Sequence, residues 1–515
     1  MGISLRDKQF LRQGENKMDN LLKLQNGSDI RGIAVEGVEG ENVNLTGEIA
    51  NRIGQGFVTW LSKKTGKKAG DLRIGVGHDS RVTADAMKNG VLAGMASMGV
   101  AVYDCGLVST PSMFMTIVFP ETSFDGSIMI TASHLPFNRN GLKFFDQDGG
   151  LESTDIKEIL TVAQDCAVAA CEKEAETFDS LSLYTKSLCE KIKAGVEAED
   201  YDHPLAGLHV VVDAGNGAGG FFAKRVLEVL GADIEGSQFL EPDGMFPNHI
   251  PNPENAQAME AIKNAVLENK ADLGIIFDTD VDRMSAVLSD GSEINRDSII
   301  AMMAAIIAKD YPGGTIVTDS VTSDRLTRFL EGELGMKQHR FKRGYKNVIN
   351  ESKRLNDEGI VSPLAIETSG HGALSENYFL DDGAYMAVKL LIAAAIAKKE
   401  GKQLQSFVAA LEPEFESREY RMKLSGEDFK EYGQSVLKAF EERAKEQGVT
   451  VVPNSYEGIR LAFDSEEVKG WALLRLSLHD PLMPLNLEGV REGDCDKMVE
   501  ILRGLLEGFD KLAVI

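Results

Sequence analysis

Residues 71–81 read DLRIGVGHDSR, residues 84–99 read ADAMKNGVLAGMASMG, and residues 100–106 read VAVYDCG. The first and last are short apolar runs typical of buried strands, and the middle segment has the apolar spacing of a helix. Strand, helix and strand in this order predict a βαβ unit. The same order recurs at 208–234, 271–283 and 315–335. We therefore expect successive α/β units over the first 400 residues or so.

The pattern changes beyond about residue 410, where a helical segment at 427–448 is followed by strand-like runs at 457–463 and 471–478. This order indicates a smaller α+β domain. We predict an α/β protein of four domains, three similar α/β mixed-sheet domains and a smaller α+β C-terminal domain, around a central catalytic cleft. The predicted domains are 1–155, 156–293, 294–408 and 409–515.

The composition indicates a globular protein, with 43% hydrophobic and 26% charged residues and no apolar run of about 18 residues that could span a bilayer. The five cysteines form neither a disulfide framework nor a paired CxxC metal site, which favours a reducing compartment. The N-terminus lacks the apolar stretch of a secretory signal. We therefore expect a cytoplasmic protein, or a plastid protein whose transit peptide has been removed.

The net charge of −25 argues against nucleic acid or an anionic membrane as a partner. An anionic small molecule would instead need cations gathered at one site. The oligomeric state expected is a monomer or a dimer.

A strand-like run in residues 271–283, ADLGIIFDTDVDR, ends in the carboxylates Asp278, Asp280 and Asp282. The strand period of two predicts that all three carboxylates point to the same side. Three hard oxygen ligands that repel one another suit Mg²⁺. The alternative is a solvated acidic turn. An EF-hand is excluded because its sixth position would be Arg283 instead of glycine.

This segment also resembles the nucleophile motif of haloacid-dehalogenase-type phosphatases, in which Asp278 would itself be phosphorylated. Asp282 stands where that motif usually has threonine or valine. A phosphatase or phosphotransferase of this kind is one alternative function.

A serine segment, TASHLPFNRNGLKFF (131–145), follows the apolar run GSIMI (126–130), which places Ser133 on a strand-to-loop turn beside His134. A serine hydroxyl is a weak nucleophile unless a base or a cation activates it, and Lys143 or a metal ion could do so. Taken alone, Ser133 would more often be an ordinary turn serine and His134 a structural residue.

Together, four motifs resemble those of the α-D-phosphohexomutase family, which includes phosphoglucomutases and phosphomannomutases. TASH, Pro136 and NGLK resemble its phosphoserine loop, and the aspartates with Arg283 resemble its metal loop. ETSGH (367–371) is similar to its sugar-binding loop, and Arg475 to Pro481 to its distal phosphate loop. Shorter resemblances are SDIRG with Arg31, GHDSR with Arg81, STP at 109–111 and RGYK at 343–346.

The resemblance implies a phosphohexomutase, an isomerase that exchanges the 1-phosphate and 6-phosphate of a hexose through a phosphoserine and a sugar bisphosphate. It implies catalytic roles for Ser133, Lys143, Arg31 and His134, and Mg²⁺ held by Ser133, Asp278, Asp280 and Asp282. A sugar 1,6-bisphosphate would act as activator. Substrate contacts are implied for Arg283, Arg343, Lys346, Glu367, Ser369, His371, Arg475, Ser477 and His479.

The distal loop departs from the family pattern, because Leu478 and His479 stand where a small residue and a hydroxyl donor are common. His479 could replace that donor, or the loop could serve another substrate. A non-catalytic sugar-phosphate sensor is therefore a second alternative function.

A third alternative comes from GNGAGG, which places Gly215, Gly217 and Gly220 in a GxGxxG pattern after a strand, with Asp233 and Glu235 downstream. This pattern is typical of dinucleotide binding and would indicate an NAD-dependent dehydrogenase. A lone GxGxxG is a weak signal, and the family carries a similar Asn-Gly turn at the opening of its second domain.

Overall fold

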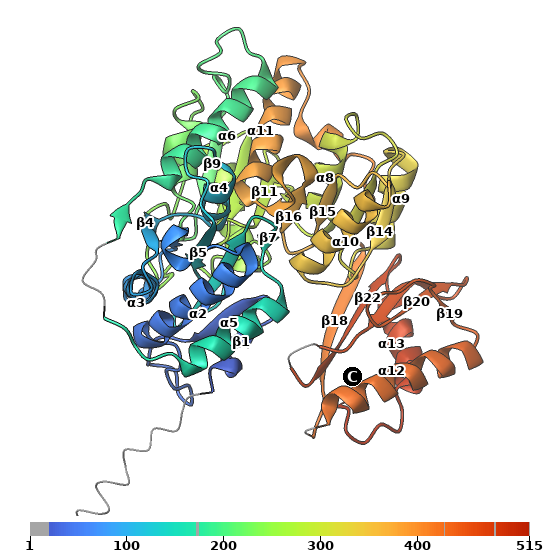
Figure 1. Cartoon of the computed structure of the whole chain (residues 1–515). Coiled ribbons are helices and arrows are strands. Elements are labelled where there is room, and N and C mark those ends of the chain that lie inside the picture. Colours follow the sequence, from blue (N-terminus) through green and yellow to red (C-terminus); the bar gives the residue numbers. More distant parts are fainter. Residues whose placement is uncertain (1–19, 171–174, 427, 478–479, 514–515) are drawn as a thin grey trace, which may run out of the picture. The chain divides into compact units, whose positions relative to one another are not determined.

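The computed structural model describes residues 20–170, 175–426, 428–477 and 480–513 (Figure 1). The chain divides into two units. Unit 1 comprises the chain up to Gly291 together with Asp382–Val388, and unit 2 comprises Ser292–Asp381 and the chain from Lys389 onward.

The first sheet of unit 1 has the strand order β1-β2-β6-β5-β3-β4-β8, with β7 paired to β6. Its strands are β1 (Gln25–Asn26), β2 (Asp29–Ile33), β3 (Arg73–His78), β4 (Ala101–Leu107), β5 (Gly126–Ile130), β6 (Arg139–Asp146), β7 (Gly149–Gly150) and β8 (Glu176–Thr177). β3 is parallel to β4 and β5, whereas β6 is antiparallel to β5 and β2. The βαβ unit predicted for residues 71–106 is confirmed, because α3 connects the parallel strands β3 and β4.

The helices of this part of unit 1 are α2 (Gly47–Thr65), α3 (Ala84–Ala96), α4 (Thr110–Val118), α5 (Ser153–Asp165) and α6 (Ser180–Val196). Glycines let α2 and α3 approach closely. A Cβ atom at Gly90 would lie 2.0 Å from the Gly47 carbonyl oxygen, and one at Gly94 would lie 2.0 Å from that of Asn51. Both glycines are therefore required by backbone contact.

The second sheet has the strand order β12-β11-β10-β9. Its first three strands along the chain are β9 (Val210–Asp213), β10 (Leu273–Phe277) and β11 (Met284–Leu288). β10 is parallel to β9 and antiparallel to β11, and all three strands are buried along their length. α7 (Ala256–Asn269) packs an apolar face on them through Met259, Ile262 and Val266. A π-helical turn spans Ala223–Leu227.

The first sheet of unit 2 has the order β14-β13-β15-β16-β17. Its strands are β13 (Thr315–Thr318), β14 (Lys337–Arg340), β15 (Leu364–Ile366), β16 (Gly372–Leu374) and β17 (Leu380–Asp381), and β12 (Glu293–Ile294) precedes α8. The helical elements are α8 (Asp297–Ile307), α9 (Asp324–Arg328), α10 (Tyr345–Asp357) and α11 (Gly383–Lys399), with short turns at Phe329–Glu333, Ser375–Asn377 and Leu404–Phe407. β13 is parallel to both β14 and β15, whereas β15 and β16 are antiparallel, so this sheet is also mixed.

The C-terminal sheet is antiparallel, in the order β18-β22-β21-β20-β19. Its elements are β18 (Glu416–Lys423), α12 (Phe429–Glu446), β19 (Thr450–Val451), β20 (Ile459–Asp464), β21 (Lys469–Leu474), β22 (Leu482–Gly489) and α13 (Asp494–Leu505). The two helices share one apolar core with the sheet, in which Phe440, Leu485 and Leu502 are buried.

α11 passes from unit 1 to unit 2, because its residues up to Val388 belong to unit 1. The Tyr184 hydroxyl donates a hydrogen bond of 2.6 Å to Asp382, and the Gly383 amide donates one of 3.1 Å to the Val281 carbonyl. A distant segment of the chain thus completes unit 1.

Three α/β domains and a C-terminal domain built on a β-sheet confirm the predicted fold class. The predicted domain boundaries and the central cleft stay predictions. Within the described residues, no helix has both the length and the apolar character needed to cross a membrane.

The contact between α2 and α3 gives a test of the fold. Gly94→Ala should lower the melting temperature by a few degrees, because its methyl group would overlap the Asn51 carbonyl, and overpacking costs about 1–3 kcal/mol. Gly504→Ala in α13 is the matched control, since a Cβ atom there meets nothing within 4 Å and alanine favours a helix by about 1 kcal/mol. Equal melting temperatures for the two variants would contradict this packing.

Candidate active site

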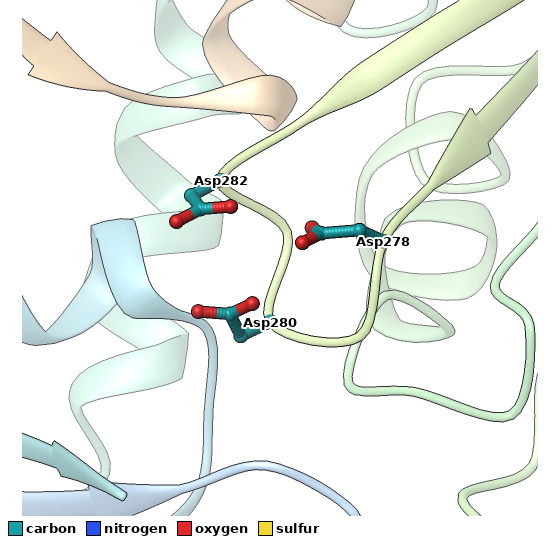
Figure 2. A group of neighbouring side chains, drawn as sticks. All are labelled: Asp278, Asp280 and Asp282. Atoms are coloured by element: carbon teal, nitrogen blue, oxygen red, sulfur yellow. The ribbon is translucent and has the colours of Figure 1, made fainter. Parts of the chain in front are cut away.

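The three aspartates lie on the loop between β10 and β11 (Figure 2). β10 ends at Phe277, so the prediction that strand alternation aligns them is wrong. A reversal of the loop brings them together instead, with Val281 at φ +68°. This left-handed conformation is costly for a β-branched residue and is typical of functional sites.

All three carboxylates are buried, and one oxygen from each lies within 4.8 Å of the others. Burial and the charges of Asp282 and Asp280 raise the pKa of Asp278 well above its ordinary value. Lys143, on β6, donates to Asp280 over 3.0 Å and also to Asp282. Burial favours a lower pKa for Lys143, but the two carboxylates outweigh it and raise that pKa.

The donor set fits a divalent metal ion. Two of the three buried carboxylates share the single ammonium group of Lys143, and the Oδ1 atom of Asp280 has no hydrogen-bond partner among the described residues. Hard oxygen ligands of this kind are those that Mg²⁺ and similar ions prefer. Asp278, Asp280 and Asp282 can therefore hold a metal ion.

The glycine-rich loop after β9 supports the aspartate loop. A Cβ atom at Gly217 would lie 2.6 Å from the Thr279 carbonyl oxygen, and one at Gly220 would lie 2.1 Å from that of Leu240. The Ala218 amide donates to the Thr279 carbonyl over 2.7 Å. Protein backbone thus occupies the space that the glycines leave, which removes the physical basis for interpreting GNGAGG as a pyrophosphate-binding turn.

Ser133 lies on the turn after β5, as predicted, with φ +50°. Its hydroxyl donates to Asp278 Oδ2 over 3.1 Å and lies 3.3 Å from Nδ1 of His134. Its amide donates to the Thr131 hydroxyl over 2.8 Å. The serine hydroxyl is therefore in contact with the aspartate cluster.

Arg81 holds this serine loop by its backbone. The buried guanidinium donates to the carbonyls of Ser133, Leu135, Pro136 and Arg139 over 2.5–2.8 Å. Burial lowers the pKa of Arg81 and raises that of its partner Asp79, whose carboxylate lies 3.4 Å from the arginine Nε. The loop shape thus depends on one cation. The GHDSR motif pointed to this residue, although it was not among the predicted site residues.

Two further predicted cations lie next to these loops. Arg31, on β2, pairs with Asp29 over 2.7 Å and donates to the Thr131 carbonyl. The Arg283 amide donates to Asp278 Oδ1 over 3.3 Å, and its Nε lies 3.9 Å from Asp278 Oδ2. The structure therefore brings together Arg31, Ser133, His134, Lys143, the three aspartates and Arg283 in unit 1.

A second group lies in unit 2, on the loop between β15 and β16. Glu367, Ser369 and His371 are buried. Nδ1 of His371 lies 3.1 Å from the Ser369 hydroxyl and 3.5 Å from Glu367. Burial opposes the charge on Glu367, but His371, Arg343 and the Gly344 amide outweigh it and lower the pKa of this carboxyl. The loop therefore presents an ionised carboxylate and a hydroxyl group.

Glu457 contacts two of the arginines predicted to bind substrate, Arg343 and Arg475. It accepts a hydrogen bond of 3.0 Å from the Arg343 amide and one of 2.5 Å from the Ser320 hydroxyl, and it lies 3.5 Å from Nη1 of Arg475. Burial lowers the pKa of Arg475, and the glutamate opposes this shift. Glu457 was not predicted from the sequence, because it lies in no recognisable motif.

Asp319 was not predicted either. It follows β13, accepts a hydrogen bond of 2.7 Å from the Thr368 hydroxyl, and lies 3.7 Å from Nε of Arg343. Burial raises the pKa of Asp319 to about 7, with a further upward contribution from Glu367 that Arg343 opposes.

Two more of the predicted substrate residues, Lys346 and Ser477, also lie in unit 2. Lys346 lies in the first turn of α10. The Ser477 hydroxyl accepts a hydrogen bond of 3.2 Å from the Asp480 amide, within its own loop. His479 lies outside the described residues.

Models of the phosphoglucomutase/phosphomannomutase family match most of the chain. The α/β/α domain I model matches residues 22–166, domain II matches 183–291, and domain III matches 295–415. The chain belongs to the phosphoglucomutase/phosphomannomutase family.

Two relatives and one solved structure illustrate the similarity. The chain is 28% identical to a phosphomannomutase/phosphoglucomutase of Pseudomonas putida, over 86% of this chain and 90% of the relative. It is 30% identical to a probable phosphoglucosamine mutase of Methanocella arvoryzae, over 87% of this chain and 93% of the relative. A phosphoglucomutase/phosphomannomutase family protein of Burkholderia thailandensis has a TM-score of 0.75 at 25% identity and covers 96% of this chain and 99% of its own.

Family membership confirms the predicted enzyme class, an isomerase of the phosphotransferase mutase type. These relatives bear the names of mutases, and none of them is named as a phosphatase, a dehydrogenase or a sensor protein. The similarity therefore gives no support to the three alternative functions.

The aspartate cluster predicts metal-dependent stability. Millimolar Mg²⁺ should raise the melting temperature of metal-stripped protein, because a bound cation stabilises the folded state. Asp280→Asn should abolish this increase by removing a ligand charge. Glu241→Gln is the control, since its side chain is 86% exposed and should not alter the increase. An undiminished increase in Asp280→Asn would contradict metal binding at the cluster.

Asp319 predicts a pH dependence in unit 2. Its folded pKa of about 7 lies above the ordinary value of 3.8, so the folded state holds the proton more tightly. The stability that this bound proton contributes is fully present below the ordinary pKa of 3.8. It is lost as the pH rises through the folded pKa of about 7. The melting temperature of the wild type should therefore fall relative to Asp319→Asn between about pH 4 and about pH 7.

The exposed Asp310→Asn is the control for this comparison, and its melting temperature should follow that of the wild type throughout. A constant difference between wild type and Asp319→Asn across the pH range would show that Asp319 is not protonated near neutrality.

Proposed function

We propose that the chain exchanges the 1-phosphate and 6-phosphate of a hexose, with Ser133 as phosphoryl carrier. The observation that carries this proposal is the contact of the Ser133 hydroxyl with Asp278 inside a cluster of buried carboxylates suited to a metal ion. Family membership gives the reaction class, and this contact supports Ser133 as the carrier.

In the proposed reaction, phosphorylated Ser133 gives its phosphoryl group to the free hydroxyl of a sugar monophosphate. The bond from phosphorus to the serine oxygen breaks, and a bond to the sugar oxygen forms. Lys143 gives a proton to the serine oxygen and regains one from the sugar hydroxyl. The sugar bisphosphate then turns over, and its other phosphoryl group returns to Ser133. A sugar 1,6-bisphosphate would consequently activate enzyme that has lost its phosphoserine.

The metal ion is proposed to be Mg²⁺, held by Asp278, Asp280, Asp282 and a serine phosphate oxygen. When bound, it neutralises negative charge on the transferring group. Lys143 contacts the same carboxylates, which keep it protonated, so its ammonium group is available to protonate the leaving serine oxygen. Arg31 and Arg283 would stabilise the charge on the transferring phosphate, and His134 would orient the serine hydroxyl.

The group in unit 2 is proposed to recognise the rest of the substrate. Glu367 can accept hydrogen bonds from two sugar hydroxyls, and Ser369 and His371 supply further polar contacts. Glu457 pre-positions two arginines for contact with the phosphate that does not react. The residues proposed to bind that phosphate are Arg343, Lys346, Arg475, Ser477 and His479.

The relatives include enzymes named for glucose, mannose and glucosamine phosphates. Activity on a panel of the three sugar 1-phosphates would identify the preferred substrate. The cytoplasmic location and the monomeric or dimeric state stay predictions.

The test is turnover with glucose 1-phosphate, Mg²⁺ and a trace of glucose 1,6-bisphosphate. Wild type should form glucose 6-phosphate, and Ser133→Ala should lower kcat by a factor on the order of 10³ or more because the carrier is lost. Ser435→Ala on α12 is the control, since that hydroxyl bonds only its own helix among the described residues. Failure of wild type to turn over any sugar of the panel would contradict the proposal.

Mass spectrometry separates the serine carrier from an aspartyl phosphate. After incubation with glucose 1,6-bisphosphate, a phosphate that maps to Ser133 and survives hydroxylamine supports the proposal. A hydroxylamine-sensitive phosphate on Asp278 would instead support the phosphatase-type mechanism.

A further inference from the structure

A cavity of about 240 Å³ lies within unit 2, between β14 and the segment that precedes β20. The catalytic group in unit 1 contributes no residue to it. The side chains that line it and carry the argument are Arg340, Arg460, His339, Phe341, Tyr456 and Ser320.

The charge of this cavity is opposite to that of the chain. Among the described residues that line it, none is an aspartate or a glutamate, although the net charge is −25. Arg340 and Arg460 both pair with a single carboxylate, Asp324, over 3.0 and 2.9 Å. Among the described residues, Asp324 is the only carboxylate within ion-pair distance of either guanidinium group, although Asp297, Glu331 and Glu488 add negative charge around them.

Both arginines also keep donors available. The bonds of Arg340 use its Nε and Nη2 atoms, and those of Arg460 use Nη1 and Nη2, so Nη1 of the first and Nε of the second have no acceptor among the described residues. Burial lowers the pKa of both, and the charge of Arg340 contributes to lowering that of Arg460 to about 10. An anion would relieve this crowding of positive charge.

An aromatic cluster forms another wall of the cavity. The ring centroids of Phe341 and Tyr456 lie 4.9 Å apart, and His339 lies 5.3 Å from Tyr456. Glu351 fixes the His339 ring through a contact of 2.9 Å. Tyr456 is 44% exposed, so its ring offers a face to a flat ligand.

We propose that this cavity binds a nucleoside monophosphate, with its phosphate on Arg340 and Arg460 and its base stacked on the aromatic cluster. Guanidinium groups bind phosphate through paired N–H donors, and aromatic rings stack on any base. The arginines alone would bind inorganic phosphate, and the aromatic rings alone would bind a nucleoside. A nucleoside monophosphate is the ligand that contacts both.

The site is connected to the substrate-binding residues of the same unit. Ser320 lines the cavity, and its hydroxyl donates to Glu457, which contacts Arg343 and Arg475. A ligand that displaced the Ser320 hydroxyl would release a constraint on both arginines. This regulatory consequence rests on the proposed function, whereas binding itself does not.

The test is calorimetric titration of the full chain with adenosine 5′-monophosphate, adenosine and inorganic phosphate. The nucleotide should bind at least about tenfold more tightly than either fragment. Tyr456→Ala should weaken nucleotide binding about tenfold or more through loss of stacking. Tyr456→Phe is the matched control, since it keeps the ring and should bind within about twofold of wild type. Melting temperatures of both variants verify their folding.

Several outcomes would overturn the proposal. These are no heat of binding at millimolar nucleotide, equal affinity for phosphate and nucleotide, or unchanged nucleotide affinity in folded Tyr456→Ala. The last would place the nucleotide at another site, such as the substrate-binding arginines. Because binding is measured without turnover, failure here is distinguishable from failure of the mutase assay.

Discussion

The repulsion among three buried carboxylates on one short loop is the constraint that organises unit 1. Asp278, Asp280 and Asp282 are held within 4.8 Å of one another and are buried. Such a cluster is costly unless positive charge accompanies it. Lys143 supplies part of that charge from β6, and the fit of the carboxylates to a divalent ion indicates how the remainder is supplied.

The surrounding structure keeps this loop in shape. The glycine-rich turn after β9 brings backbone against Thr279, and Arg81 ties the serine loop by four carbonyl groups. The left-handed conformations of Ser133 and Val281 show that both loops are held against local preference. In unit 2, Glu457 accepts a hydrogen bond from the Arg343 backbone amide and pairs with the guanidinium group of Arg475, whose pKa the charge of Arg343 helps to lower.

Much of the fold and of the candidate site could be predicted from the sequence, because strand and helix periodicity and the four ordered motifs are local signals. The βαβ unit at β3, α3 and β4, the fold class, and the position of Ser133 after β5 were obtained in this way. The reason why the three aspartates lie close together could not be predicted from the sequence. The end of β10 and the conformation of Val281 depend on packing against distant backbone. Asp319 and Glu457 are ordinary acidic residues in the sequence, and only folding places them beside Arg343. The GxGxxG pattern left a dehydrogenase open as an alternative, because identical glycines can admit a cofactor or another part of the chain.

The return of Asp382–Val388 to unit 1 has a consequence for synthesis on the ribosome. Gly383 packs on the backbone of Val281 and Arg283, and Asp382 accepts the Tyr184 hydroxyl bond. The loop that carries the aspartates therefore cannot reach its final packing until about a hundred further residues have been translated, at ~5–20 residues per second. During that interval of about 5–20 seconds, the nascent chain would expose an incomplete acidic loop. Domain-by-domain folding from the N-terminus is thus interrupted, and the carboxylates acquire their final environment only after most of the next domain has emerged.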